Sequence, residues 1–418
     1  MKVYVIGAGP AGIAASIAAS RKGHSVTLLE KNEKIGKKLY ITGKGRCNLT
    51  NACSFDEFIS NVVTNPKFLY SALRNFGAAE TMSLVESGGT ELKIERGNRV
   101  FPSSDKSSDI IKAFSKLLNQ SGVEVRLNEK VLSLNSSDNK IIEIVTDKHS
   151  YTDCDAVIVA TGGMSYPSTG SDGDGYRFAE ATGHTVVPVV AALTGMRLSN
   201  MYGSGGKTFS FGNLSRLRGV SLKNVRVSVV RNGKMLFEEF GEMIFTDRGV
   251  SGPVILTLSS KINRMDFTSL KLQIDLKPAL SEEELNSRIL RDFSVTLNKD
   301  FKNSLDALLP SGLIPSVITA CGIKPDKKIN SVTKEERFSL VKTLKNWTFG
   351  IEGCEELSGA VVTAGGVSVK EVNPADMRSK LIENLYFAGE VLDVDALTGG
   401  FNIQIALSTG YCAGSHIK

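Results

Sequence analysis

The sequence predicts an α/β fold with a parallel sheet and, in the middle of the chain, a strand-rich and then a helix-rich segment. The first 30 residues alternate strand, glycine-rich turn, helix and strand. Buried apolar runs at residues 155–160 and 385–388 each end close to glycine, which is typical of strands in a parallel sheet. Between about residues 190 and 276, apolar and polar residues alternate between glycines, which indicates antiparallel strands.

The chain begins with a glycine-rich turn between a strand and a helix. The segment MKVYVIGAGPAGIAASIAASRKGHSVTLLE predicts strands at residues 2–6 and 25–29, a helix at residues 13–22, and G-x-G-x-x-G at Gly7, Gly9 and Gly12. In this Rossmann fingerprint the first glycine makes a tight turn, the second lets the backbone approach a pyrophosphate, and the third lets the helix pack on the strand. The helix N-terminus offers free N–H donors to phosphate. Glu30 is placed to accept hydrogen bonds from ribose hydroxyls.

The same residues also resemble a secretory signal peptide. Lys2 precedes an apolar run, and the small residues from Ala14 to Ser20 are similar to a cleavage region. A signal peptide would be followed by an unrelated mature domain, whereas the strand–helix–strand pattern continues without a break to Glu30. This continuity favours a dinucleotide site.

The composition is typical of a globular protein. The chain has 418 residues, of which 41% are hydrophobic and 22% charged, enough for two or three domains with their own cores. No apolar run approaches the roughly 18 residues that a membrane span needs. The six cysteines have neither C-x-x-C nor metal-ligand spacing, which predicts a reducing cytoplasm and no metal site. The net charge of +6 is compatible with an anionic ligand or a nucleic acid.

A glycine-rich and basic segment, GKKLYITGKGRCNLTN, follows the second strand at residues 36–51. Its turn-forming and hydrogen-bonding residues predict a loop wrapped over an anionic cofactor; a solvated surface loop is the alternative. Cys47 lies in this loop, but the next cysteine, Cys53, is too far along the chain for a C-x-x-C or C-x-x-x-x-C pair. A dithiol reductase is therefore not expected.

The segment after the strand at residues 155–160 has the pattern of a ligand-binding turn. Thr161, Gly162 and Gly163 follow the carboxyl end of the strand, where open α/β sheets bind their ligands. A helix is predicted at residues 173–183. A plain strand–turn–helix unit without a ligand would have the same pattern.

The last segment, LYFAGEVLDVDALTGGFNIQIALSTGYCAG, distinguishes between FAD and NAD. It predicts a strand at residues 385–388, then Gly389 and Glu390, a loop, and a helix at residues 403–413. Such a segment places a carboxylate beside a polyol and a helix N-terminus beside a ring that gains negative charge on reduction. The ribityl chain of FAD would meet Glu390, and its pyrimidine would face the amides of residues 400–403. NAD has no ribityl chain, so the segment favours FAD.

Five motifs together resemble those of a known family. They are GAGPAG, GKKLYITGKGRCNLTN, ATGGMSYP, FTDRGVSGP and AGEVLDVDALTGGFNIQ. Over essentially its whole length, the chain is similar to the bacterial aminoacetone oxidase-like, or BaiN-like, NAD(P)/FAD-dependent oxidoreductases. The resemblance implies non-covalent FAD and a discontinuous Rossmann-type FAD-binding domain with an inserted antiparallel β-barrel domain and a small helical subdomain. It also implies reduction of conjugated C=C bonds, as in steroidal bile-acid intermediates, or of uracil to dihydrouridine in ribosomal RNA.

The middle of the chain is consistent with such an insertion. We expect the FAD-binding domain at residues 1–189 and 350–418, the β-barrel substrate domain at residues 190–278 together with about 335–349, and the helical subdomain at residues 279–334. Residues 231–234 predict a hairpin turn, and residues 281–284 predict the start of a helix with an acidic first turn.

The expected contacts with FAD come from several of these segments. They are Gly7, Gly9, Pro10, Ala11, Gly12, Glu30, Lys31, Lys38, Gly45, Arg46, Cys47, Asn48, Thr50, Val131, Ala160, Thr161, Gly162, Gly389, Glu390, Asp393, Gly400, Phe401, Asn402 and Ile403. Tyr166 and Tyr40 are the candidate proton donors, and a buried structural tyrosine is the alternative for each. Asp393 either orients the loop at the flavin or caps a turn.

We therefore expect a cytoplasmic FAD-dependent oxidoreductase, in which NAD(P)H drives hydride transfer through FAD to a conjugated C=C bond of a small molecule such as a steroid or bile-acid enone. No second G-x-G-x-x-G marks a site for the nicotinamide nucleotide, and the oligomeric state is left open. One alternative is an enzyme that reduces uracil in ribosomal RNA, with phosphates bound by the basic segments 37–38, 44–46 and 216–231. The other is a non-enzymatic FAD-binding protein.

Overall fold

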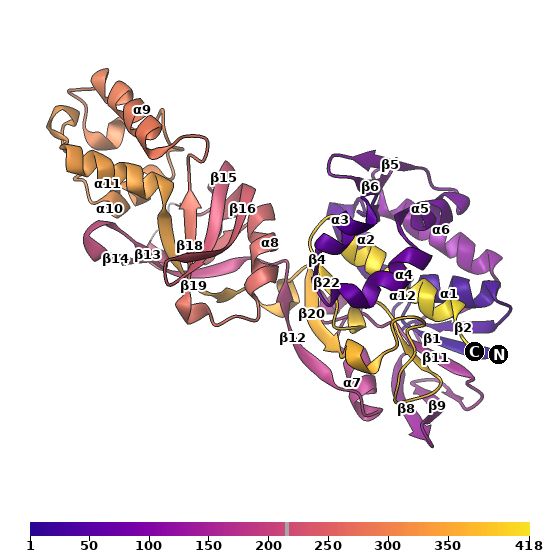
Figure 1. Cartoon of the computed structure of the whole chain (residues 1–418). Helices are drawn as coiled ribbons and strands as arrows, with labels where there is room; N and C mark the ends of the chain where they lie inside the picture. Colours follow the sequence, from indigo (N-terminus) through magenta and orange to yellow (C-terminus); the bar gives the residue numbers. More distant parts are fainter. Residues whose placement is uncertain (214–216) are drawn as a thin grey trace. The chain divides into compact units, whose positions relative to one another are not determined.

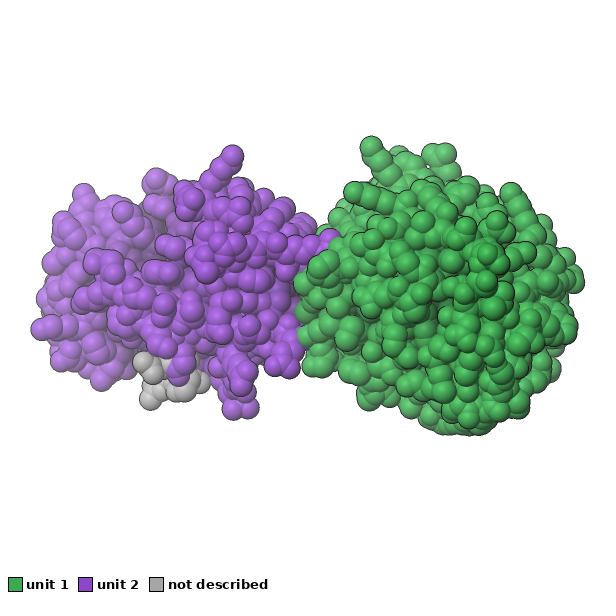
Figure 2. Space-filling view, turned by 90° about the horizontal axis from the view of Figure 1, so that it is seen from below, with its two compact units in different colours: residues 1–192, 357–418 green, residues 193–356 purple. Residues whose placement is uncertain are grey.

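The computed structural model describes residues 1–213 and 217–418; Arg216, at one end of a predicted basic segment, lies outside the described residues. The chain forms two compact units (Figure 2). Unit 1 consists of Met1–Ala192 and Leu357–Lys418, and unit 2 of Leu193–Glu356. Unit 1 is therefore built from both ends of the chain, with one continuous segment inserted between them.

Unit 1 is organised around a five-stranded parallel sheet, which confirms the Rossmann-type α/β fold. Its strands lie in the order β21-β11-β1-β2-β7. They are β1 (Lys2–Ile6), β2 (Ser25–Leu29), β7 (Glu124–Arg126), β11 (Ala156–Val159) and β21 (Leu385–Phe387). Because all five are parallel, their carboxyl ends meet at one edge of the sheet. The turns after β1, β11 and β21 therefore lie along the same edge.

Helices and small sheets complete unit 1. The helices are α1 (Pro10–Arg21), α2 (Lys37–Gly45), α3 (Phe55–Ser60), α4 (Tyr70–Asn75), α5 (Ala78–Ser87), α6 (Ser107–Gln120), α7 (Asp174–Ala181) and α12 (Phe401–Ser415). The smaller sheets are formed by β3 (Thr50–Asn51), β5 (Leu92–Glu95) and β6 (Arg99–Pro102), by β8 (Val131–Ser137), β9 (Lys140–Thr146) and β10 (Ser150–Tyr151), by β12 (Val186–Ala192) and β20 (Val362–Val367), and by β4 (Val62–Thr64) and β22 (Asp395–Ala396).

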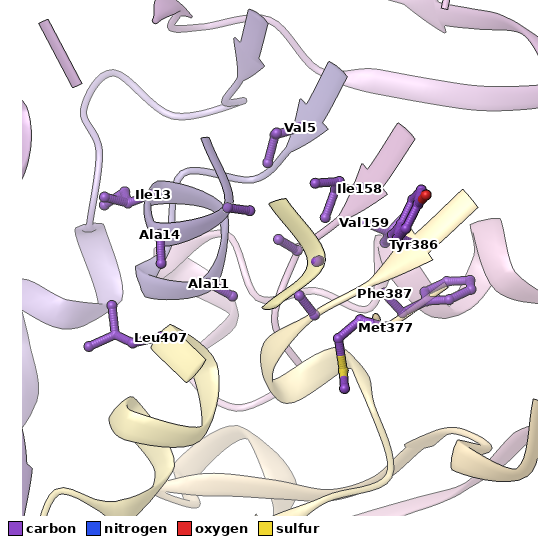
Figure 3. Close-up of a cluster of buried hydrophobic side chains, with 14 of the residues drawn as sticks. Val5, Ala11, Ile13, Ala14, Ile158, Val159, Met377, Tyr386, Phe387 and Leu407 are labelled. Atoms are coloured by element: carbon purple, nitrogen blue, oxygen red, sulfur yellow. The ribbon is translucent and has the colours of Figure 1, made fainter. Parts of the chain in front are cut away.

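The core of unit 1 lies between the parallel sheet and the helices α1 and α12, which come from opposite ends of the chain and lie side by side (Figure 1). Figure 3 shows part of this core. Val5, Ile158 and Phe387 project from three neighbouring strands and are completely buried, as is Leu407 of α12. Burial of each such side chain contributes about 1.5–3 kcal/mol.

The segment predicted as a loop at residues 36–51 is helical at its start, so that part of the prediction was wrong. Gly36 has left-handed φ and ψ angles, and α2 begins directly after it. Leu39 is buried and anchors this first turn. The helical geometry breaks at Thr42, and Gly43 is left-handed, which returns the chain to a turn. Burial of one apolar side chain outweighs the loop-forming tendency of the surrounding glycines.

Unit 2 contains an antiparallel sheet and, within the described residues, four α-helices. The strands lie in the order β14-β13-β17-β16-β15-β18-β19. They are β13 (Met196–Tyr202), β14 (Thr208–Ser210), β15 (Ser221–Arg231), β16 (Lys234–Phe245), β17 (Gly249–Ser251), β18 (Leu270–Asp275) and β19 (Trp347–Cys354). The helices are α8 (Pro253–Ile262), α9 (Glu282–Ser294), α10 (Ile314–Cys321) and α11 (Lys334–Lys345). The predicted hairpin turn joins β15 to β16, and the predicted helix start at Ser281 caps α9.

Candidate cofactor site

The first turn of the chain leaves open space beside the N-terminus of α1. Gly7 has φ of +101°, and a Cβ on Gly12 would lie 1.8 Å from the carbonyl oxygen of Gly7, so the fold requires both glycines. Gly9 differs, because a Cβ there would meet no atom within 4 Å. No side chain caps the helix, and Pro10 occupies its first turn. Free N–H groups beside open space at a helix N-terminus form a binding site for phosphate.

Glu30 is buried at the carboxyl end of β2. One carboxylate oxygen accepts a hydrogen bond from the N–H of Ala8 at 2.8 Å, and the other accepts from the backbone and side-chain nitrogens of Asn32 at 2.8 and 2.7 Å. A carboxylate offers about four acceptor positions, so about one remains for a ribose hydroxyl. Glu30 also fixes the glycine-rich turn, a role that the motif did not predict. Val131 begins β8 nearby, since the N–H of Glu129 donates to the carbonyl of Glu30 at 2.9 Å.

Two basic residues predicted to contact FAD are engaged by carboxylates. The Lys31 ammonium lies 2.8 Å from Asp174. The Arg46 guanidinium donates to Asp105 at 2.8 Å and lies 4.2 Å from the centre of the Phe101 ring. These contacts hold neighbouring segments of unit 1 together. A role of either residue in FAD binding stays a prediction.

Glu390 gathers hydrogen-bond donors from three segments of unit 1. Its carboxylate accepts from the Lys38 ammonium at 2.9 and 3.1 Å, from the Ser165 hydroxyl at 3.2 Å and from the Thr363 N–H at 2.9 Å. Lys38 also donates to Ser165 at 2.6 Å. Lys38 and Glu390 were predicted for this site, and Ser165 and Thr363 were missed. A threonine within the otherwise apolar run that forms β20 was the available signal for Thr363.

The N-terminus of α12 is also without a side-chain cap. Gly400, with φ of +98°, precedes it, and a Cβ there would lie 2.4 Å from the carbonyl oxygen of Thr50. With its amide nitrogen toward Thr50, Asn48 donates to that carbonyl at 3.2 Å and accepts from the N–H of Gly400 at 3.1 Å. The Thr50 hydroxyl donates to Gln404 at 2.6 Å. The predicted residues Asn48, Thr50 and Gly400 are therefore brought together, with Gln404 as a partner that the sequence did not indicate.

Three other predicted residues of the C-terminal segment make contacts within the protein. The Phe401 ring packs edge-on against Phe58, with 5.0 Å between ring centres. The Asn402 side chain bonds to both backbone groups of Ala396 at 2.9 and 2.7 Å. Asn65 donates to the carbonyl and the carboxylate of Asp393 at 2.7 and 3.1 Å. These contacts shape the loop before α12, so a ligand would meet the backbone N–H groups of residues 401–403 rather than the side chains of Phe401 and Asn402.

The uncapped N-termini of α1 and α12 face the same direction. A Cβ on Gly410 or Gly414 of α12 would lie 2.1 Å from the carbonyl oxygen of Ala11 or Ala15 of α1, respectively. The two helices therefore run parallel and in close contact, and α12 extends past the start of α1 by about 12 Å. Two positive helix ends in this arrangement suit a ligand that carries a pyrophosphate at one place and an electron-accepting ring at another. FAD has both groups.

Among the buried polar atoms of unit 1 that have no hydrogen-bond partner within the described residues are the side-chain oxygens of Asn51 and Thr161. The amide nitrogen of Asn51 donates to the carbonyls of Gly97 and Gly399 at 3.0 Å each, but its oxygen has no donor. Thr161 lies two residues after the end of β11, and its hydroxyl also has no hydrogen-bond partner. Leaving such an atom unsatisfied costs about 1–3 kcal/mol, which favours a polar ligand. The residues present therefore fit FAD.

The two candidate proton donors lie outside these contacts. The Tyr40 side chain is 45% exposed, with the Lys34 ammonium 5.1 Å from the centre of its ring. Tyr166 has φ of +55° in the turn before Pro167. Neither hydroxyl has a hydrogen-bond partner in the described part of the chain. Their roles stay predictions.

Cys47 will be inert in the folded protein. The side chain is completely buried, and burial raises its pKa to about 12. At pH 8 almost none of the thiol is therefore the thiolate, the reactive form. We expect iodoacetamide to leave Cys47 unlabelled at pH 8 and to label it in guanidinium, as measured by mass spectrometry of its peptide. Rapid labelling of Cys47 without denaturant would contradict its buried position.

The described residues add two general findings. No helix among them has the length and apolar character of a membrane span. Within residues 1–213 and 217–418, no group of three or more His, Cys, Asp or Glu side chains is arranged to hold a metal ion.

Comparison with known proteins identifies the family. Residues 1–416 match the family model described as HI0933-like protein Rossmann domain. The chain belongs to this family. This HI0933-like protein is 31% identical to the 3-dehydro-bile acid delta(4,6)-reductase of Clostridium scindens, over 99% of this chain and 98% of the relative. It is 30% identical to the ribosomal RNA dihydrouridine synthase of Escherichia coli K12, over 98% of this chain and 96% of the relative.

A solved structure supports the fold of this HI0933-like protein. The 3-ketosteroid-delta4-(5alpha)-dehydrogenase from Rhodococcus jostii RHA1 superposes with a TM-score of 0.53 at 16% identity, covering 99% of this chain and 96% of that one. At this identity the likeness concerns the fold alone. Together with the family match, it confirms the fold of an FAD-dependent oxidoreductase, as the sequence motifs predicted.

Proposed function

We propose that this HI0933-like protein is an NAD(P)H-driven reductase that transfers hydride through FAD to a conjugated C=C bond of a small molecule such as a steroid or bile-acid enone. FAD, when bound, supplies the hydride chemistry. The observation that carries the proposal is the pair of uncapped, parallel helix N-termini with Glu390 beside them. A Cβ on Gly389, which precedes Glu390, would lie 2.7 Å from Ala11 of α1 and 3.7 Å from Ala406 of α12. The bile-acid reductase relative supports an enone acceptor.

The protein groups have separate roles in this proposal. The N–H groups at the start of α1 bind the pyrophosphate, and Glu390 binds a hydroxyl of the ribityl chain. The N–H groups at the start of α12 stabilise negative charge on the pyrimidine. The Lys38 ammonium, 2.9 Å from Glu390, holds that carboxylate in place and adds positive charge to the site.

Protonation of the second carbon of the double bond requires an acid or water. Tyr40 and Tyr166 are the candidate acids in this proposal, and the Tyr40 side chain is exposed to solvent. Replacement of either tyrosine by phenylalanine tests this role through the pH dependence of the enone-reduction rate.

An anaerobic absorption titration tests the reductase proposal. We expect NADH or NADPH to bleach the flavin bands of the purified protein, and 4-androstene-3,17-dione to restore them. The corresponding saturated ketone, which has no conjugated C=C bond, is the matched control and should leave the flavin reduced. A flavin that neither nucleotide bleaches, or that no enone reoxidises, would contradict the proposal.

A second candidate function is the reduction of uracil in ribosomal RNA. It is favoured by the dihydrouridine synthase relative and by the location of the positive charge. Unit 2 carries 24 Lys and Arg against 18 Asp and Glu, whereas unit 1 carries 26 of each, so the whole net charge of +6 belongs to unit 2. Formation of dihydrouridine in a ribosomal RNA transcript, with binding that weakens as salt rises, would establish this activity. RNA binding that ignores salt would argue against it.

We also propose that the antiparallel sheet of unit 2 closes into the predicted barrel. β13 pairs with both β17 and β19. Each of the strands β13, β17, β16, β15, β18 and β19 therefore has two partners among the other five. Such a ring of pairings supports closure, since a closed barrel has no free strand edge.

A further inference from the structure

Unit 2 contains an open groove of about 1000 Å³. One side is the outer face of the sheet at β13, β18 and β19, and the other is one face of α11. The turn at Gly203 and Gly205 also lines it, and a Cβ on Gly205 would meet no atom within 4 Å. All of the lining residues belong to unit 2, and none of them is among the residues described for the cofactor site.

The sheet side of the groove is a polar row that crosses three strands. Tyr202 of β13 lies opposite Thr348 of β19, and Gln273 of β18 lies opposite the same Thr348. Lys271 is two residues before Gln273 and therefore shares its face. The Lys271 ammonium lies 4.3 Å from the centre of the Tyr202 ring, a cation–π contact that holds the charge at the groove.

The helix side of the groove carries cations and an aromatic ring. Lys334, Phe338 and Lys342 are four residues apart along α11, so they lie on one face. The Phe338 side chain is 37% exposed, with the Lys334 ammonium 5.9 Å from the centre of its ring. Asn346 follows on the same side, at the end of the helix.

Two positive charges of the groove contact aromatic rings, but none contacts a carboxylate within the described residues, whereas the negative charges are stabilised by helix ends. Among the described residues, no carboxylate forms an ion pair with Lys271, Lys334 or Lys342. Glu282 and Glu335 also line the groove, but each lies in the first turn of a helix, where the helix dipole stabilises a carboxylate. The helix dipoles therefore account for the two carboxylates in the groove. The three lysine ammonium groups remain available to bind an anion.

We propose that this groove binds a nucleoside phosphate, either as a free nucleotide or within an RNA strand. The lysine ammonium groups would bind phosphate, and the exposed ring of Phe338 would stack on a base. The amides of Gln273 and Asn346 offer both donors and acceptors to the edge of a base. The location of the whole net charge of +6 on unit 2 agrees with an anionic ligand there. The proposal does not depend on the acceptor reduced at the flavin.

Binding measurements on the full FAD-loaded chain test the groove. The probes are uridine monophosphate, followed by calorimetry, and a fluorescent oligouridylate, followed by anisotropy. For whichever probe binds the wild-type protein, we expect Lys271→Ala combined with Lys342→Ala to weaken the affinity at least tenfold. We expect Phe338→Ala to weaken it several-fold. For the oligonucleotide, each lost phosphate contact should also lower the slope of log affinity against log salt by about 0.7.

The matched control is Lys299→Ala combined with Lys302→Ala. Both lysines are exposed in unit 2 and outside the groove, so this variant removes the same charge and should change binding less than twofold. Binding of uridine monophosphate that the groove variants weaken would identify a free nucleotide as the ligand. Such binding of the oligonucleotide alone would identify an RNA strand, and either result supports the proposal. Binding of neither probe, or equal weakening in groove and control variants, would overturn it. Flavin reduction by NAD(P)H, measured on the same samples, tests the reductase proposal separately.

Discussion

Replacing Gly12 by alanine will leave the protein without bound FAD and will lower its free energy of unfolding by about 3 kcal/mol. The added Cβ would lie 1.8 Å from the carbonyl oxygen of Gly7 and 3.4 Å from the Val5 side chain. The first of these is a backbone atom, which cannot rotate away, so the helix and the strand must separate. Urea denaturation and the ratio of flavin to protein measure the two effects.

Gly9→Ala is the control that separates fold from binding. Gly9 has φ of −78° and ψ of −177°, which alanine adopts without strain, and its Cβ would meet no protein atom within 4 Å. We expect the free energy of unfolding to change by less than about 0.5 kcal/mol. The methyl group would instead occupy the space proposed for the pyrophosphate, and the affinity for FAD should fall about tenfold, or about 1.4 kcal/mol. Unchanged affinity in this variant would show that the phosphate does not lie at the start of α1.

Changes at Lys38 and Glu390 will shift the flavin midpoint potential in opposite directions. Glu390→Gln removes a negative charge and should raise the potential, because the reduced flavin is anionic and is then better stabilised. Lys38→Met removes the positive charge 2.9 Å from Glu390 and should lower the potential. We expect each shift to be about 30 mV, equivalent to about 1.4 kcal/mol for a two-electron couple. Anaerobic titration against dyes of known potential measures it.

Lys37→Met is the matched control for this pair of variants. Its ammonium lies 3.2 Å from Glu33 and, among the described residues, contacts neither Glu390 nor Ser165, so the change removes a neighbouring charge that has another partner. We expect a shift of less than about 10 mV, since surface charges are screened by water and salt. Shifts of the same sign for Lys38→Met and Glu390→Gln would contradict the proposed electrostatic roles.

The sequence was sufficient to predict those parts of the fold whose turns depend on the spacing of glycines. β1 and β2 have the predicted limits, because a short apolar run between turns has few alternatives in a parallel sheet. Gly7 and Gly12 are required by backbone contacts that any such turn must make. α12 begins at Phe401, two residues before the prediction, because Gly400 rather than the apolar periodicity determines its start.

Contacts between distant segments could not be predicted from the sequence. Lys38 and Glu390 are 352 residues apart, and neither local pattern indicates the other. Arg46 was expected at the cofactor because it lies in a basic segment, and the sequence did not indicate that it also pairs with Glu95 of β5. In the same way, Lys334, Phe338 and Lys342 have the pattern of an ordinary solvated helix face. Only the strand register of β13, β18 and β19 places a polar row opposite them.

The cofactor content of the purified protein tests the central claim most directly. If α1 and α12 form a dinucleotide site, the protein should contain one FAD per chain, visible by its flavin absorption. Mild acid should release the cofactor intact, and chromatography should identify it as FAD, because no covalent link is expected. A correctly folded protein that holds no FAD after purification, and none after incubation with excess FAD, would contradict the account.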